Sequence, residues 1–363
     1  MKVLQIINSL YTGGAEKLLI DIVPLFQEKG IDCDVLSLKN EKTPFWEILK
    51  LKSKGEIIGL TKGSVYNPLL IFKIIPFLKK YDIIHVHLFP AFYWVVLAKW
   101  ISFSKTKIIY TEHSTTNRRV NNFLLRNIDK VIYKDLNKII TISDKVDENI
   151  KKYLNKLPKK NFKLILNGVN VSNFLKAKPY PKSDFFSKDD FILIQVAGFR
   201  IEKDHTTLIR SLIHLPSNIK LLLVGEGSLK IENEDLVRTL GLEDRVKFLG
   251  IRMDIPQLLK TADIIILSTH YEGLSLSCIE GMAVKPFIGS NVPGLKEIVK
   301  DYGLLFEHEN DKELASLILK LANDPVYYKQ IAQRCVERAK EFDIEKMINS
   351  HESVYKEVID IEN

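Results

Sequence analysis

The chain has 363 residues, of which 46% are hydrophobic and 27% are charged. This length exceeds the size at which one hydrophobic core usually stops growing, so we expect two domains. The composition is that of a folded globular protein, which excludes an intrinsically disordered chain. No repeat of fixed period is visible, which excludes a solenoid.

The net charge of +8 is unevenly distributed along the sequence. Residues 1–170 carry 28 Lys and Arg against 15 Asp and Glu, a net charge of +13; the remainder carries 25 against 30, a net charge of −5. Lysines gain about 1 kcal/mol each near anionic lipid headgroups. The first half is therefore expected to contact an anionic membrane or a phosphorylated acceptor, or else to be a solvated lysine-rich surface.

Cysteine usage and hydropathy indicate a cytoplasmic protein. The three cysteines are far apart: Cys33, Cys278 and Cys335. Their spacing predicts neither a disulfide framework nor a zinc site. The N-terminus lacks the pattern of a signal peptide. The longest apolar stretches, residues 69–78 and 91–103, are shorter than the roughly 20 residues that a spanning helix needs.

Short apolar runs rich in Val, Ile and Leu alternate with longer segments of helical periodicity. The first series is residues 3–7, 34–38, 83–87, 107–111, 138–142 and 163–166. The second series is residues 191–196, 220–224, 246–249, 264–267 and 286–289. Such continuous apolar strands between helices predict parallel sheets covered on both faces, and hence two Rossmann-like α/β domains.

A polar, proline-containing segment separates the two series. The predicted division is an N-terminal domain at 1–172, a linker at 173–190, a C-terminal domain at 191–342 and a final helical segment at 343–363. The linker carries Pro179 and Pro181 and few aliphatic residues. The final helix follows a completed sheet, so it is free to pack back on the N-terminal domain.

The segment after the apolar run 264–267 combines two carboxylates with a turn. Glu272 lies in the loop, Gly273 supplies the turn, and Glu280 lies in the second turn of the helix that begins near Ser275. Ligands of open α/β sheets bind outside the carboxyl ends of the strands. A helix start attracts phosphate, and a carboxylate accepts hydrogen bonds from a ribose diol.

This segment resembles the E-x7-E motif of glycosyltransferase family 4. Lys285-Pro286, Pro293-Gly294 and Glu297-Ile298 look like the rest of that signature. The resemblance implies the GT-B fold, in which two Rossmann-like domains with parallel sheets face each other across a cleft. It also implies a retaining glycosyltransferase that uses a nucleoside-diphosphate sugar.

Further matches extend over nearly the whole chain. Arg200 and Lys203 look like the family's basic loop, which holds the donor diphosphate, although they are three residues apart instead of the commoner five. Gly225 and Gly227 look like its nucleotide-side loop, with backbone contact to the base. Together with Gly273, Leu274, Ser275 and Glu280, these glycines are the donor-binding candidates of the C-terminal half.

The N-terminal half supplies two further candidates. Tyr11-Thr12-Gly13-Gly14 resembles the family's glycine loop near donor phosphate and acceptor, although it is also readable as a plain turn. His113, in Thr111-Glu112-His113-Ser114, resembles the histidine beside the transferred sugar. His85 and His87 alternate on a strand and share one face. They are expected to be structural or cleft-lining, and a metal pair lacks an evident third ligand.

The family mechanism implies catalysis by His113, Arg200, Lys203 and Glu272 without a bound metal. The leaving phosphate takes the acceptor proton in a front-face attack, so no carboxylate nucleophile of the glycosidase type is expected. Asp32-Cys33-Asp34 matches the letters of a DxD motif, at the start of a strand. The expected cofactor set is therefore none beyond the nucleotide sugar.

Several alternatives remain open from the sequence. A sugar-nucleotide 2-epimerase on a similar scaffold needs no acceptor, and a non-catalytic sugar-nucleotide-binding protein shows neither transfer nor hydrolysis. A nucleic-acid-binding surface is not expected, because the aromatic residues 92–94 and Trp100 fall in one helical segment. They are core residues or a membrane-resting patch. The favoured role is synthesis of bacterial capsule, lipopolysaccharide or exopolysaccharide at the inner face of the plasma membrane.

Overall fold

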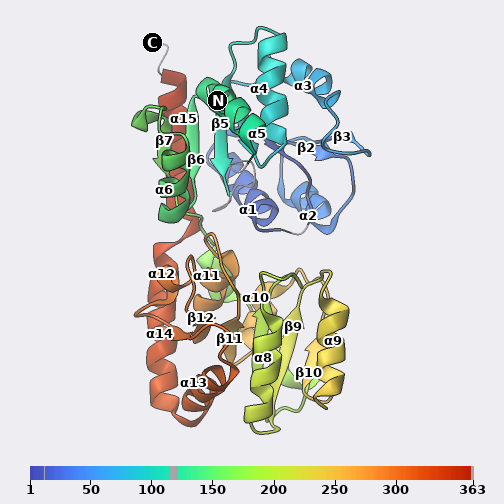
Figure 1. Cartoon of the computed structure of the whole chain (residues 1–363), viewed down its shortest axis with the longest axis vertical. Helices are drawn as coiled ribbons and strands as arrows, with labels where there is room; N and C mark the ends of the chain where they lie inside the picture. The colour runs from blue at the N-terminus through green and yellow to red at the C-terminus, as the bar shows by residue number, and fades with distance from the viewer. Residues whose placement is uncertain (12, 114–121, 361–363) are drawn as a thin grey trace. The chain divides into compact units, whose positions relative to one another are not determined.

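The chain forms two compact units that are each built on a parallel sheet (Figure 1). The computed structural model describes residues 1–11, 13–113 and 122–360. Unit 1 combines residues 1–168 with the final helix, and unit 2 comprises residues 169–343. The expectation of two parallel α/β domains is confirmed.

Unit 1 contains a seven-stranded sheet, within the described residues, of order β3-β2-β1-β4-β5-β6-β7. Its strands are β1 (Lys2–Ile7), β2 (Asp32–Lys39), β3 (Ile57–Thr61), β4 (Ile83–His87), β5 (Lys107–Glu112), β6 (Lys138–Thr141) and β7 (Phe162–Leu164). Its helices are α1 (Gly14–Glu28), α2 (Pro44–Lys52), α3 (Leu70–Leu78), α4 (Ala91–Ile101), α5 (Phe123–Ile132), α6 (Asp144–Tyr153) and α15 (Ile344–Asp360). A 3-10 turn, η2 (Tyr133–Asp135), follows α5.

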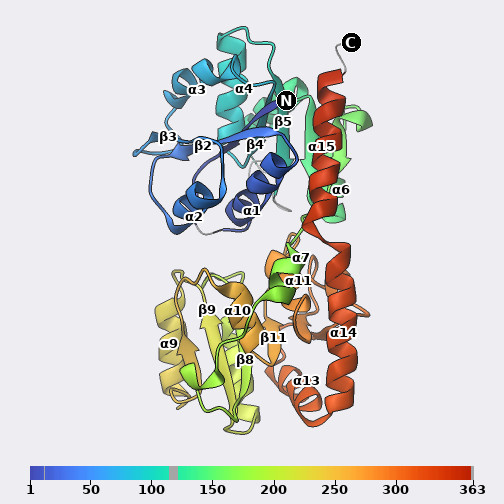
Figure 2. The same cartoon turned by 180° about the vertical axis from the view of Figure 1, so that it is seen from behind.

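Strand alternation sorts the side chains of unit 1 between two faces. On β1, Leu4 and Ile6 enter a core shared with α3, α4, η2 and α6. Gln5 lies between them and points to the opposite face, where it contacts Tyr355. Helices α1 and α15 pack against each other on that face (Figure 2). The ring of Phe26 on α1 lies 5.5 Å from that of Tyr355 on α15, measured between centroids.

A buried hydrogen-bond network fastens α15 to the sheet. The Gln5 amide Nε2 donates to the Tyr355 hydroxyl (3.0 Å), and that hydroxyl is hydrogen-bonded to His85 Nδ1 (2.7 Å). His85 Nε2 in turn is hydrogen-bonded to the Thr111 hydroxyl (2.7 Å). Burial holds the pKa of His85 well below its ordinary value, and it lowers the pKa of His351 to about 4. Both imidazoles are therefore neutral near pH 7.

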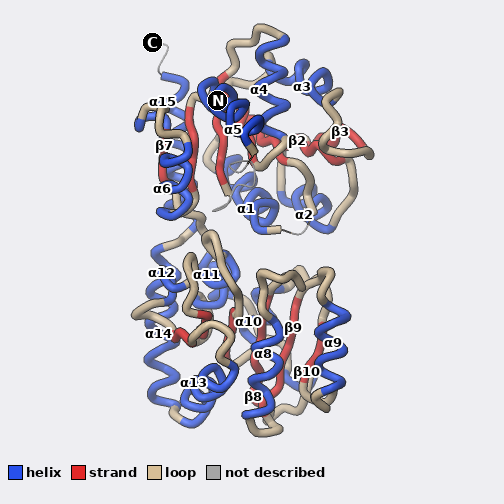
Figure 3. Tube along the Cα trace, in the orientation of Figure 1, coloured by secondary structure: helices blue, strands red, loops and turns tan. Residues whose placement is uncertain are grey.

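Unit 2 contains a six-stranded sheet, counted over residues 169–343, of order β10-β9-β8-β11-β12-β13 (Figure 3). Its strands are β8 (Phe191–Val196), β9 (Ile219–Val224), β10 (Val246–Phe248), β11 (Ile264–Leu267), β12 (Phe287–Ser290) and β13 (Leu304–Phe306). Its helices are α7 (Val171–Lys176), α8 (His205–Ser211), α9 (Lys230–Thr239), α10 (Ile255–Thr261), α11 (Leu276–Met282), α12 (Lys296–Val299), α13 (Asp311–Asn323) and α14 (Pro325–Glu341).

The predicted linker at 173–190 is wrong, because this segment is part of unit 2. Phe174 and Phe185 are buried in the core of unit 2, and Lys182 Nζ lies 2.6 Å from Asp263 Oδ2. The first domain therefore ends at Gly168 and not at residue 172. The chain returns to unit 1 between residues 343 and 344, and α15 packs there. Pro179 and Pro181, which suggested a linker, lie in an irregular loop that is part of unit 2.

Two further sequence predictions concern the cysteines and the apolar helices of the described residues. Cys33, Cys278 and Cys335 are free and buried. Over the described residues, none of the helices has the combination of length and apolar character needed to cross a membrane.

We predict that Tyr355→Phe destabilises unit 1 by about 1–3 kcal/mol. The substitution removes the hydroxyl and leaves Gln5 Nε2 and His85 Nδ1 buried without their shared partner. Urea unfolding at pH 7 measures the free energy of unfolding. Tyr66→Phe is the control, because Tyr66 is 62% exposed in the same unit and its loss should cost little. Equal stability of the two variants would contradict the role of the network.

We also predict that unit 1 loses stability as the pH falls from about 6.5 towards 4. The folded state keeps His85 and His351 neutral, whereas the unfolded chain binds protons below the ordinary histidine pKa of about 6.5. Each residue then contributes a slope of at most about 1.4 kcal/mol per pH unit. His351→Gln removes one of these protons, so urea unfolding between pH 6.5 and 4.5 should give a shallower slope. An unchanged slope in that variant would rule out the assignment.

Candidate functional site

Two loops at the carboxyl ends of adjacent strands form the candidate site of unit 2. Residues 197–204 follow β8, and residues 268–275 follow β11, its neighbour in the sheet. Three hydrogen bonds join them: Thr269 Oγ1 to Glu202 O (2.7 Å), His270 N to Glu202 O (2.9 Å) and Ser268 Oγ to Asp204 Oδ2 (3.0 Å). The loops are therefore positioned as one piece.

An ion pair connects the same two loops through their side chains. Lys203 Nζ donates to Glu272 Oε1, and the two side chains are 23% and 9% exposed. The Lys203 backbone is anchored by His205, whose Nδ1 donates to the Lys203 carbonyl (2.6 Å). Burial lowers the pKa of His205 to about 4, so this imidazole is neutral. The ring of Phe199 stacks on it at 4.2 Å.

A single turn explains the three-residue spacing of the two cations. The Lys203 amide donates to the Arg200 carbonyl (3.0 Å), which closes a β-turn with the two residues at its ends. Arg200 is exposed and Lys203 is partly buried. Arg200 and Lys203 are closer in sequence than is common in the family, but both cations still lie in one short loop.

The glycines beside this loop allow close contact between backbones. A Cβ on Gly225, whose φ is +144°, would lie 2.2 Å from the Ala197 carbonyl oxygen. A Cβ on Gly227 would lie 2.3 Å from the Phe199 carbonyl oxygen. Packing against residues 197–199 is thus a sufficient reason for both glycines, and their contact with a nucleotide stays a prediction.

Pro293 and Gly294, which the sequence analysis assigned to the family signature, contact the backbone of Glu272. The Glu272 amide donates to the Pro293 carbonyl (3.2 Å). Gly294 has φ +85°, and a Cβ there would lie 2.1 Å from the Glu272 carbonyl oxygen. These two residues therefore fix the backbone that carries the carboxylate.

The second glutamate lies on the short helix α11. Ser275 caps this helix by accepting a hydrogen bond from the Cys278 amide (3.4 Å), and Gly273 and Leu274 precede the cap. Glu280 is 8% exposed, so its carboxylate is largely removed from water. The helix covers seven residues.

In unit 1, His113 directly follows β5 and belongs to a chain of uncharged groups. His87 Nε2 donates to Gln5 Oε1 (2.8 Å), so His87 Nδ1 carries a lone pair. This lone pair accepts from His113 Nε2 (3.0 Å). Burial lowers the pKa of His113 to about 4. The consequence is a neutral imidazole whose Nδ1 is a hydrogen-bond acceptor.

The same network answers the question of a metal pair at His85 and His87. Both ring nitrogens of each histidine take part in hydrogen bonds, so neither offers a free lone pair. In the DxD-like segment, Asp34 is buried and accepts from Tyr81 and from the Glu56 amide. These residues are structural.

The glycine loop of unit 1 is placed at the start of α1. Gly13 is the N-terminal cap of that helix, and a Cβ on Gly14 would meet no atom within 4 Å. The packing of unit 1 therefore does not require glycine at position 14. Thr12 and Ser114 of the two quoted motifs lie outside the described residues.

One group was missed by the sequence reasoning altogether. His270, His308 and Glu309 bring their ligand atoms within 4.8 Å of one another. They come from separate loops, so no spacing in the sequence signals their meeting. Gln5 and Tyr355, which orient the histidines of unit 1, were missed for the same reason.

Comparison with known proteins covers both units. Residues 12–173 match the family model described as Glycosyltransferase Family 4, and residues 177–342 match Glycosyl transferases group 1. A Campylobacter jejuni relative, N-acetylgalactosamine-N,N'-diacetylbacillosaminyl-diphospho-undecaprenol 4-alpha-N-acetylgalactosaminyltransferase, is 27% identical and covers 93% of this chain and 94% of its own. The N-acetyl-alpha-D-glucosaminyl L-malate synthase of Bacillus anthracis is 28% identical over 77% of this chain and 75% of its own.

Solved structures show the same fold. Anabaena HepE in complex with UDP-glucose has a TM-score of 0.84 at 22% identity, covering 98% of this chain and 100% of its own. WaaG, a glycosyltransferase involved in lipopolysaccharide biosynthesis, has a TM-score of 0.74 at 15% identity, covering 98% and 99%. With the two family models spanning its two units, the chain belongs to glycosyltransferase family 4 and is a glycosyltransferase of the GT-B fold.

Proposed function

We propose that the chain transfers a sugar, with retention of configuration, from a nucleoside-diphosphate sugar to a glycan or lipid-linked acceptor. The process is the synthesis of a bacterial capsule, lipopolysaccharide or exopolysaccharide. The observation that carries the proposal is the Lys203–Glu272 ion pair, at the edge of the sheet where α/β proteins bind ligands. The names of the relatives support it: the Campylobacter enzyme specifies a diphospho-undecaprenol-linked acceptor, and the HepE structure contains UDP-glucose.

Lys203 and Arg200 are assigned to the donor diphosphate. Cleavage of the bond between sugar and phosphate leaves extra negative charge on the departing nucleoside diphosphate. Cations held in place before the reaction stabilise that charge without reorganisation, so the proposal requires no metal ion. The Lys203 ammonium has three N–H donors; one stays on Glu272 while the others reach phosphate oxygens.

The two glutamates are assigned to donor binding and not to nucleophilic attack. Glu280 is proposed to accept hydrogen bonds from the ribose hydroxyls, and Glu272 to contact the sugar or phosphate side. The negative charge of Glu272 is engaged by Lys203, which makes it a poor nucleophile. We therefore favour front-face attack, in which the acceptor hydroxyl bonds to the anomeric carbon and its proton goes to the leaving phosphate. Backbone groups at Gly225, Gly227, Gly273, Leu274 and Ser275 complete the proposed donor contacts.

In unit 1, His113 is assigned a hydrogen-bonding role. Its imidazole is neutral and presents Nδ1 as an acceptor, which suits a sugar hydroxyl better than a phosphate. Gly13 and Gly14, at the start of α1, are proposed to approach the donor phosphate or the acceptor.

We further propose that unit 1 rests on the anionic inner face of the plasma membrane. Residues 1–168 and 344–363 carry 30 Lys and Arg against 20 Asp and Glu, a net charge of +10; residues 169–343 carry 23 against 25, a net charge of −2. A lipid-linked acceptor would be met at such a surface. The charge of unit 1 is thus suited to attract anionic headgroups.

The outer surface of α4, α5 and α6 is the proposed contact. Five large apolar side chains are exposed there: Trp100, Ile101, Phe103, Ile128 and Val131. Phe103 is 92% exposed. Lys99 Nζ on α4 lies 3.1 Å from Asp135 Oδ2 after α5, which ties the two helices together. Beside them, Lys130, Lys134 and Lys156 line a pocket of about 140 Å³ with Leu154 and Leu157.

The sequence left residues 92–94 and Trp100 as either core residues or a membrane-resting patch, and most of them are core residues. Phe92 and Tyr93 are buried, and Trp94 is partly buried and donates to the Val65 carbonyl (2.8 Å). Trp100 is 38% exposed and joins the apolar surface. Apolar side chains between lysines are the arrangement that binds a membrane interface.

We predict that Lys203→Ala and Glu280→Ala each lower kcat/KM for sugar transfer by about 10²-fold or more. The assay follows release of nucleoside diphosphate from UDP-sugars, with and without acceptor, so that transfer is distinguished from epimerisation and hydrolysis. Lys356→Ala is the control, because Lys356 forms an exposed ion pair with Glu352 on α15. Wild-type activity in the Lys203 or Glu280 variant would refute that assignment, provided that thermal unfolding shows both folded.

We predict that unit 1 binds vesicles containing phosphatidylglycerol and not vesicles of phosphatidylcholine alone. Replacing Lys130, Lys134 and Lys156 together by Glu removes about 3 kcal/mol or more of attraction, which is roughly a hundredfold weaker partition in co-sedimentation. The matched control replaces Lys42, Lys50 and Lys52 by Glu; these exposed lysines precede or lie on α2, away from the proposed surface. Phe103→Ser should weaken binding, and Leu51→Ser, 87% exposed on α2, should not. An equal loss of vesicle binding in both triple-lysine variants would indicate a non-specific charge effect and would disprove this contact surface.

A further inference from the structure

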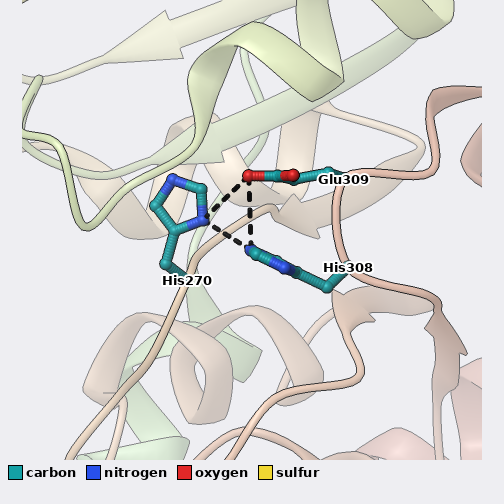
Figure 4. A group of neighbouring side chains, drawn as sticks. All are labelled: His270, His308 and Glu309. Carbon is teal, nitrogen blue, oxygen red and sulfur yellow. Dashed lines mark hydrogen bonds and ion pairs between the residues drawn. The ribbon is translucent and has the colours of Figure 1, made fainter.

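Three side chains of unit 2 converge on a point that no step of the proposed transfer uses (Figure 4). His270 lies in the loop after β11, two residues before Glu272. His308 and Glu309 lie in the loop after β13. Parallel strands place their carboxyl ends at one edge of the sheet, and that common edge brings the two loops together.

The ligand atoms are close enough to share one ion. His270 Nδ1 and His308 Nε2 lie 2.5 Å apart and share a hydrogen bond, which a bound ion would replace. Glu309 Oε1 lies 3.7 Å from His270 Nδ1 and 3.9 Å from His308 Nε2. Zinc–nitrogen bonds of about 2.0–2.1 Å in a tetrahedral site place ligand atoms roughly 3.3 Å apart. The three observed separations lie on both sides of that value, so small side-chain rotations would complete the geometry.

The identity of the ligands selects the class of ion. Two imidazoles and one carboxylate form a zinc ligand set, whereas calcium and magnesium prefer oxygen ligands alone. The side chains are 29%, 39% and 63% exposed for His270, His308 and Glu309, so a hydrated ion can reach them. Three protein ligands leave one tetrahedral position for water.

We propose that His270, His308 and Glu309 bind a zinc-class divalent cation that clips the loop after β11 to the loop after β13. The ion is a clip and not part of the chemistry of transfer. It would hold the segment 268–275 from a second side, in addition to the hydrogen bonds from His270 N and Thr269 Oγ1 to the Glu202 carbonyl. The importance of a more firmly held Glu272 for sugar transfer rests on the proposed function, whereas the ion site itself does not.

The test is zinc titration of the purified full-length chain after removal of metal with EDTA and dialysis. Calorimetry should show one tight zinc equivalent, and Co²⁺ should give the visible absorption of a tetrahedral site with imidazole ligands. His270→Ala and His308→Ala should each weaken binding at least tenfold, and Glu309→Gln should weaken it less. Hydrogen exchange of residues 268–275 should slow when zinc is added.

The matched control is His214→Ala. His214 lies in the same unit, is 35% exposed at its side chain, lies 3.6 Å from Asp311 and is not one of the three proposed ligands. This variant should bind zinc as the natural chain does. The inference is overturned if no zinc binds, or if the affinity survives in both His270→Ala and His308→Ala. Unfolding of the metal-free variants at the natural midpoint confirms that lost binding is not lost folding. Transfer activity is not the readout, so failure here leaves the proposed function standing.

Discussion

Close approach between backbones is the constraint on which the candidate donor site depends. The loop after β8 can lie against its neighbours only because Gly225 and Gly227 have no side chain to strike the Ala197 and Phe199 carbonyls. Gly294 makes the same allowance for the backbone of Glu272. Hydrogen bonds to the Glu202 carbonyl then join the two loops. The Lys203–Glu272 ion pair is the outcome of these backbone contacts, since neither side chain could find the other from mobile loops.

The constraint in unit 1 is different: its buried histidines must be oriented while they remain neutral. A protonated imidazole deep in the sheet would be costly because the interior does not solvate charge. The network avoids this cost by matching each donor to an acceptor from Gln5 through His87 to His113, and through Tyr355 to His85. Tyr355 comes from α15, so the last helix of the chain helps to set which nitrogen of His113 bears the proton.

The sequence predicted the parts of the structure that depend on local pattern. Eleven strands were expected within about two residues of where they lie, because buried parallel strands are continuous apolar runs. The two that were missed are edge strands: β3 is only partly buried and contains Gly59, and β13 has three residues. The segment 173–190 was misread because prolines and lysines resemble a linker, while Phe174 and Phe185 anchor it in the core. Glu272, Lys203 and His113 were predicted as site residues through a resemblance to family motifs. His270 with His308, and Gln5 with Tyr355, meet only through packing across the sheet, and single-sequence patterns carry no such information.

The ion pair of Lys203 has a consequence for how the proposed donor is held. A partly buried ammonium without a counter-charge would be unfavourable, and Glu272 supplies that charge within the same unit. On the proposed assignment, an arriving diphosphate would therefore share Lys203 with a carboxylate that is already in place. The gain in binding energy is the difference between the two anions and not the full attraction to a lysine. That difference grows as the sugar bond breaks and charge builds on the diphosphate, because the carboxylate charge stays fixed. On the proposed assignment, the pair would bind the ground state moderately and the developing leaving group more strongly, which is the condition for an electrostatic contribution to rate.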